Sequence, residues 1–144
     1  MNNGNGTFGS PIGYAGDSLF VVTADLNEDD YLDLVEAYWD GGFAVMLNFG
    51  NGTFQPPTNY GTINNPSSLA LGDFNGDGHT DLAVTSNYDN DVVVLLNNGN
   101  GTFGPGSTYA TANNPVWVAA GDFNGDGHGC ASHLPGGREA ADQL

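Results

Sequence analysis

The feature that most constrains the fold of this chain is an internal repeat with a period of about 48 residues. One short motif occurs three times, as "GNGTFG" (4–9), "GNGTFQ" (50–55) and "GNGTFG" (99–104). A longer acidic motif recurs with the same period, as "ADLNEDDYLDL" (24–34), "GDFNGDGHTDL" (72–82) and "GDFNGDGHGCA" (121–131). Such a chain must build one small structural unit repeatedly and bury each unit against its neighbours.

Each repeat has the pattern of four short β-strands. In the second repeat they are "SSLALGD", "DLAVTS", "VVVLLNN" and "TFGPGSTY", separated by the acidic motif, the turn "NYDND" and the turn "GNG". Leu69 and Leu71 alternate with small residues, as in a strand, and no stretch before residue 129 has helical periodicity. Four antiparallel strands per repeat form the blade of a β-propeller, so we expect an all-β fold.

The repeats divide the chain into parts. Residues 1–128 are predicted repeat structure, composed of an orphan outer strand (1–14), two blades (15–60 and 61–109) and the start of a further blade (110–128). Residues 129–144 keep no trace of the strand expected there, and we predict a disordered tail or a short helix. Closed propellers need at least about four blades, so the sequence predicts a partial propeller, truncated at both ends.

The charge balance excludes several classes of partner. The chain holds 17 acidic residues and one basic residue, Arg138, for a net charge of −16. Nucleic acid and anionic membrane surfaces are excluded because both are bound through Lys and Arg. No segment approaches the roughly 20 apolar residues of a membrane span, and "MNNGNGTFGS" has no signal-peptide pattern. With 39% hydrophobic residues, the chain is expected to fold with bound cations rather than stay disordered.

The acidic motif has the spacing of a calcium loop. Calcium takes six to eight oxygen ligands, and alternate residues of a tightly curled loop turn their side chains toward a common centre. Gly78, at the sixth position, permits the left-handed backbone that lets the next carbonyl point inward. The ligands expected in the second repeat are Asp73, Asn75, Asp77, the carbonyl of His79, and Asp81.

At "GDFNGDGHTDLAV" and "NNGNGTF" the sequence resembles the FG-GAP family, also called VCBS repeats, over about residues 1–128. That family includes the propellers of integrin α-chains and many bacterial surface and secreted proteins. The resemblance implies a structural calcium ion in each acidic loop. It also implies an extracellular or cell-surface protein that acts in adhesion or lectin-like carbohydrate binding, without catalysis.

The other two loops depart from this pattern. In the first repeat the matching positions are Asp25, Asn27, Asp29, the carbonyl of Tyr31, and Asp33. Asp30 replaces the sixth-position glycine there, and because Asp tolerates positive φ we expect the site to be retained with weaker geometry. In the third repeat the matching positions are Asp122, Asn124, Asp126 and the carbonyl of His128. Cys130 occupies the ninth position, and a thiol is a poor ligand for a hard cation.

Other interpretations of these motifs are weaker. "GNGTFG" fits a dinucleotide-binding loop, but no helix follows it, and we expect a hairpin turn. Its Asn-Gly-Thr triplets are formal glycosylation sequons, although recurrence at one turn position favours a conformational cause. A transition-metal cluster of His128, Cys130 and His133, and paired carboxylates for glycoside hydrolysis, are both disfavoured. Trp117 is expected to be buried, whereas Trp39 is equally compatible with stacking on a sugar.

Three functions therefore stay open at the level of sequence. The first is a calcium-binding module whose partner is a glycan or a protein. The second is a non-catalytic accessory module of a secreted enzyme. The third is a self-assembling fragment, because each terminal blade would expose an apolar face, and two chains would complete a homo-oligomeric ring of about six blades.

Overall fold

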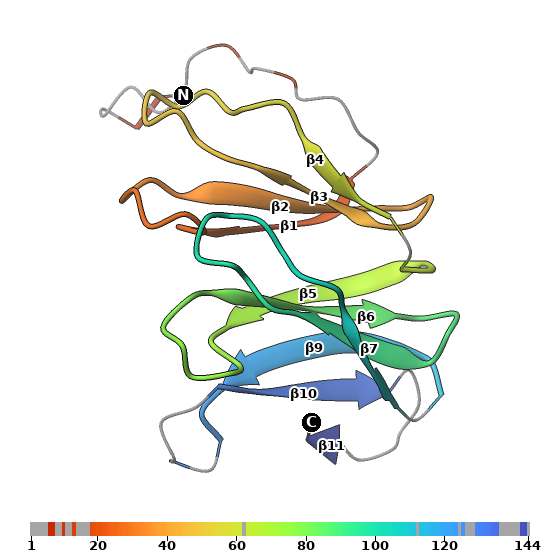
Figure 1. Cartoon of the computed structure of the whole chain (residues 1–144). Coiled ribbons are helices and arrows are strands. Elements are labelled where there is room, and N and C mark those ends of the chain that lie inside the picture. The colour runs from red at the N-terminus through yellow and green to blue at the C-terminus, as the bar shows by residue number, and fades with distance from the viewer. Residues whose placement is uncertain are drawn as a thin grey trace.

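The computed structural model describes residues 6–7, 10, 13, 18–61, 63–111, 113–123, 125, 129–135 and 142–143. These residues form three antiparallel sheets that lie one above another (Figure 1). Within the described ranges there is no helix, and thus none that could cross a membrane. The predicted all-β fold is confirmed. The described sheets form an open stack and not a closed ring, so the structure does not establish a propeller.

The first sheet has the order β1-β2-β3-β4 and contains Ser18–Ala24, Asp33–Tyr38, Phe43–Met46 and Thr58–Tyr60. The second sheet repeats this order as β5-β6-β7-β8, with Pro66–Gly72, Asp81–Ser86, Asp91–Leu95 and Ser107–Ala110. The third sheet has the order β11-β10-β9 and contains Pro115–Gly121 (β9), Cys130–Pro135 (β10) and Asp142–Gln143 (β11). The four strands predicted for the second repeat are thus confirmed as β5 to β8.

The first strands of the first and second sheets, β1 and β5, each pack against the next sheet. Phe20 and Val22 of β1 contact a core between the first and second sheets to which Leu69 of β5 belongs. The neighbouring residue on β5, Ala70, belongs instead to a core between the second and third sheets, together with Val118 of β9. Since successive residues of a strand point to opposite faces, β5 is apolar on both sides because a sheet lies on each side of it.

The two described "GNG" segments, 50–52 and 99–101, form the expected hairpin turns. Bridges join Asn48 to Phe54 and Asn97 to Phe103, and Gly101 has a φ of +75°, which suits glycine. In the second repeat the Thr102 backbone N–H and hydroxyl both donate to Oδ1 of Asn100, at 3.1 and 2.6 Å. In the first repeat, Thr53 donates the same pair of bonds to Asn51. The recurrence of Asn-Gly-Thr therefore has a conformational cause.

One expectation for the C-terminal part, the absence of a strand after residue 129, is wrong. Residues Cys130–Pro135 form β10, which pairs with β9 from Cys130↔Gly121 to Pro135↔Pro115. Backbone pairing with an existing edge does not require the apolar pattern of the other repeats, and the buried Ala131 fills the place of a larger side chain. The short helix expected near the C-terminus falls mostly on residues 136–141 and 144, which lie outside the described part, and the described Asp142–Gln143 form β11.

The prediction that Trp117 is buried is also wrong, because its side chain is 60% exposed. It lies on β9 next to Val118, which is buried toward the second sheet. The alternation of the strand turns Trp117 to the opposite face, over which no further sheet lies in the described structure. Trp39, in the turn between β2 and β3, is 67% exposed.

Candidate metal centre

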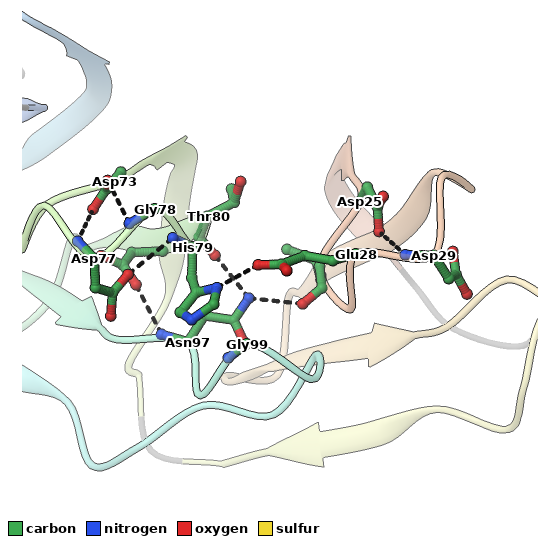
Figure 2. A network of polar contacts seen from close by, with 12 residues as sticks. Asp25, Glu28, Asp29, Asp73, Asp77, Gly78, His79, Thr80, Asn97 and Gly99 are labelled. Atoms are coloured by element: carbon green, nitrogen blue, oxygen red, sulfur yellow. Dashed lines mark hydrogen bonds and ion pairs between the residues drawn. The ribbon is translucent and has the colours of Figure 1, made fainter.

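Two acidic loops lie at the same edge of neighbouring sheets. The first loop (25–32) joins β1 to β2, and the second loop (73–80) joins β5 to β6. Figure 2 shows Glu28 of the first loop directed toward His79 of the second. The stacking of the sheets thus brings together two segments that are 48 residues apart in the sequence.

The first aspartate of the second loop organises the turn. Oδ1 of Asp73 accepts hydrogen bonds from the N–H groups of Gly76 at 2.7 Å and Asp77 at 3.2 Å, and its Oδ2 accepts one from Gly78 at 2.9 Å. Consecutive donors converge on one carboxylate because glycines at positions four and six adopt positive φ, 76° and 91°. The loop is therefore curled around its first aspartate, as the sequence predicts.

The first loop shares this arrangement, and one bond of the same kind is described in the third. Oδ1 of Asp25 accepts from Asp29 N–H at 3.1 Å, and its Oδ2 accepts from Asp30 N–H at 2.8 Å. Asp30 has a φ of +68°, so it does take the left-handed conformation that the sequence analysis required of it. In the third repeat Asp122 Oδ1 accepts from Gly125 N–H at 2.6 Å. The remaining predicted ligands of the third loop, residues 124, 126 and 128, lie outside the described residues.

The residues at positions three and five form a second layer of bonds. In the second loop Asn75 Nδ2 donates to Asp77 Oδ2 at 2.8 Å, and His79 N–H donates to Asp77 Oδ1 at 2.9 Å. These bonds, the one from His79 first, hold the pKa of Asp77 below its ordinary value. The first loop repeats the amide bond, from Asn27 to Asp29 at 2.9 Å. Its Asn27 Oδ1, however, is buried and has no hydrogen-bond partner.

The aspartate at position nine is not in the loop proper, because it begins the second strand of each sheet. Asp81 is completely buried. Its Oδ2 accepts from Phe74 N–H at 2.9 Å and its Oδ1 from Asn97 N–H at 2.8 Å. It therefore ties the start of the acidic loop to the turn after β7. Burial raises the pKa of this carboxyl in spite of the two bonds.

Asp33 makes the same connection in the first sheet. It accepts from Leu26 N–H at 2.9 Å and from Asn48 N–H at 2.7 Å. It is also completely buried, and burial raises its pKa. Each carboxylate oxygen offers two lone pairs, so one backbone bond to each oxygen does not exhaust either group as a ligand.

Asn48 and Asn97 bind the backbone of the acidic loops, and the sequence analysis missed both. Nδ2 of Asn97 donates to Thr80 O at 3.1 Å in its own sheet and to Leu26 O at 2.9 Å in the first acidic loop. Asn48 donates to Leu32 O at 2.9 Å, the position that corresponds to Thr80. The available signal was an asparagine three residues before the Asn-Gly pair in both "MLNFGNG" and "LLNNGNG".

The side chain of His79 has a role other than the one predicted for its carbonyl. Its Nδ1 contacts Oε1 of Glu28, and this bond raises the pKa of the imidazole. The ring lies against Gly99, where an added Cβ would come within 2.7 Å of Cε1 (Figure 2). Glu28 has a φ of +61°, so the contact between the loops is made by a residue in a strained conformation.

The donor chemistry of the loops fits calcium. No group of three or more His, Cys, Asp or Glu side chains is gathered to hold a metal in the described part of the chain. Calcium nevertheless accepts amide and backbone oxygens as readily as carboxylates, and it is these hard oxygen donors that each loop supplies. Asn27 Oδ1, a buried oxygen with no donor, is the atom that a cation would satisfy.

In a comparison with known protein families, one family model matches the chain. The model of the FG-GAP-like repeat matches the chain twice, over residues 25–84 and 73–129. Together the two matches extend from the first acidic loop to the end of the third. No curated protein matches the chain.

Proposed function

The chain belongs to the FG-GAP-like repeat family, and from that membership we propose that it is a calcium-binding repeat module of the β-propeller type. The observation that carries the proposal is the buried, unpartnered Oδ1 of Asn27 in a loop otherwise lined by carboxylates. A buried oxygen without a donor costs about 1–3 kcal/mol, and a bound cation removes that cost. The same cation offsets the repulsion among the aspartates of the loop.

The proposed ligands are side-chain oxygens at positions one, three, five and nine and a backbone carbonyl at position seven. In the first loop they are Asp25, Asn27, Asp29, Tyr31 and Asp33. In the second loop they are Asp73, Asn75, Asp77, His79 and Asp81, and in the third Asp122, Asn124, Asp126 and His128. The N–H bonds to position one hold the second loop in a curled conformation, which supports this assignment.

Calcium in this role is structural. An ion present at ten times its dissociation constant stabilises the folded state by about 1.4 kcal/mol, so two or three ions would contribute a few kcal/mol. FG-GAP-like repeats are typical of extracellular proteins, where calcium is abundant. We therefore propose that the protein acts outside the cell or on its surface, in adhesion or glycan binding and without catalysis.

A calorimetric titration of chelator-stripped protein with calcium tests the proposal. We expect at least two sites, and we expect Asp73→Ala and Asn27→Ala each to remove one. Asp40→Ala is the matched control, because Asp40 is exposed in the turn between β2 and β3 and belongs to no loop site. Absence of binding at millimolar calcium, in a sample whose circular dichroism shows β-structure, would overturn it.

Glycan binding is a second candidate, favoured by the surroundings of Trp39. This side chain is 67% exposed and lines a groove of about 350 Å³ together with Asn65 and Asn87. A flat indole beside amide groups is the combination that binds a sugar ring by stacking and hydrogen bonds. On a glycan array we expect Trp39→Ala to abolish binding and Tyr88→Ala, a change at another exposed aromatic, to preserve it. Equal binding by both variants would exclude this groove.

A further inference from the structure

Within the described residues, exposed apolar side chains lie on the outer strand of the sheet at each end of the stack. On the third sheet, Trp117 is 60% exposed and Phe123 is 50% exposed. On the first sheet, Val21 is 56% exposed. We call these the β9 face and the β1 face. The equivalent positions of the other repeats are buried between sheets, and they indicate what each face would contact.

Phe123 occupies the second position of its acidic loop, as Leu26 and Phe74 do in theirs. Leu26 is 1% exposed, in the core between the first and second sheets. Phe74 packs against the core between the second and third sheets, to which Val118 belongs. In both cases the side chain at this position fills the junction with the following sheet. Phe123 is also a large apolar side chain at this position, but no following sheet is described beside it.

The β1 face is the complementary half of the same junction. Leu69 of β5 and Val118 of β9 are 8% and 5% exposed, and each points toward the preceding sheet. Val21 is at the corresponding place on β1, one residue before the inward-facing Val22. The two open faces therefore carry the two sides of a contact that the chain already makes twice.

A hydrogen bond across the internal junction supports the same match. Asn97 Nδ2 reaches back to the carbonyl of Leu26 in the preceding loop, at 2.9 Å. Asn48 holds the equivalent place in the first sheet, and within the described residues its Nδ2 donates only to Leu32 O. The repeat equivalent of the Leu26 carbonyl at the other end of the stack is the carbonyl of Phe123.

We propose that two copies of this chain associate head to tail, with the β9 face of one packed on the β1 face of the next. In this contact Trp117 and Phe123 cover Val21, and Asn48 donates to the carbonyl of the partner's Phe123. The occupant is a second copy because the contact continues an interface that exists twice within the chain. The association is heterologous, since each face complements the other and not itself.

The high negative charge acts against this contact without preventing it. Each copy carries a net charge of −16, but repulsion between exposed charges is largely screened beyond about 8 Å at physiological salt. Association should therefore strengthen as salt is raised from low to physiological concentration. This salt dependence is opposite to that of a contact between oppositely charged surfaces.

Sedimentation velocity of the full chain in physiological salt and millimolar calcium tests the proposal. We expect the mass to rise with concentration above the 14.9 kDa of a single chain. Val21→Glu and Trp117→Glu should each weaken self-association by more than about ten-fold, because each places a charge in the centre of one face. Tyr88→Glu is the control, an equal change at a residue that is 74% exposed and belongs to neither face.

The decisive sample is an equimolar mixture of the two glutamate variants. Val21→Glu retains an intact β9 face and Trp117→Glu retains an intact β1 face, so the mixture should form a heterodimer although neither variant associates alone. A wild-type chain that stays monomeric at all concentrations would overturn the proposal. So would a symmetric contact, in which Trp117→Glu abolishes association while Val21→Glu leaves it intact. The readout is mass, so it is independent of whether the loops bind calcium.

Discussion

Replacing Asp81 by alanine removes two hydrogen bonds that connect distant parts of the second sheet. The carboxylate is completely buried and accepts the N–H groups of Phe74 and Asn97 at 2.9 and 2.8 Å. Without it, both donors lose their acceptor, and the turn after β7 is no longer tied to the start of the acidic loop.

The size of the effect follows from these two donors. A buried group left without its partner costs about 1–3 kcal/mol, so two donors cost about 2–6 kcal/mol. Part of this is offset because the variant no longer buries a carboxyl whose pKa is raised by burial. We therefore expect Asp81→Ala to lower the free energy of unfolding by about 2–4 kcal/mol.

Urea unfolding with and without chelator distinguishes this structural role from calcium ligation. If the two backbone bonds are the main contribution of Asp81, the loss persists in chelator. If the side chain acts only as a ligand, chelator abolishes the difference between wild type and variant. Asp77→Ala is the control, because this exposed residue bonds only within its own loop. A loss below about 0.5 kcal/mol in chelator would refute the reasoning.

Three further changes have defined outcomes. Asp30→Gly should stabilise the protein by up to about 1 kcal/mol in urea unfolding, because its φ of +68° suits glycine. Gly99→Ala should destabilise it by about 1–2 kcal/mol, since the new Cβ meets the His79 ring at 2.7 Å at a φ of +76°. Gly125→Ala, at the same φ but with no atom within 4 Å, should show the backbone cost alone. Asp91→Asn should raise the melting temperature at neutral pH, because burial, and then a neighbouring carboxylate, raise the pKa of Asp91 and its Oδ1 is buried without a partner. The ionised form is therefore destabilising, and the penalty disappears as pH falls through the raised pKa toward the ordinary value of 3.8. The advantage of the variant should shrink over that range, and a difference that is constant with pH would contradict this cause.

The local features of the acidic loops were predictable from the sequence. Glycine at position six and alternating oxygen-bearing residues specify a curled loop whatever surrounds it, and Asp73 is bonded as that pattern requires. Even the exception was predictable, because Asp30 takes the positive φ that aspartate tolerates. These are properties of a few consecutive residues, which is why one sequence is enough to find them.

The contacts between repeats were not predictable in the same way. His79 meets Glu28 from a position 51 residues away, and Asn97 meets Leu26 from 71 residues away. Only the stacking of the sheets determines these pairs, and the periodic pattern does not say which side chains face one another across the junction. The strand at Cys130–Pro135 was missed for a related reason, because the edge of β9 pairs with its backbone and its side chains give no strand pattern.

The bond from Asn97 to the carbonyl of Leu26 also bears on how this chain folds and opens. The final hairpin of the second sheet cannot complete its hydrogen bonds until the first acidic loop has taken its native shape. Local opening of that loop, in turn, releases a buried amide in the neighbouring sheet. Nearest-neighbour links of this kind make a stacked array cooperative beyond the single repeat. Hydrogen exchange at Asn97 and Gly99 should therefore slow or quicken together with exchange in the loop that precedes them by one full repeat.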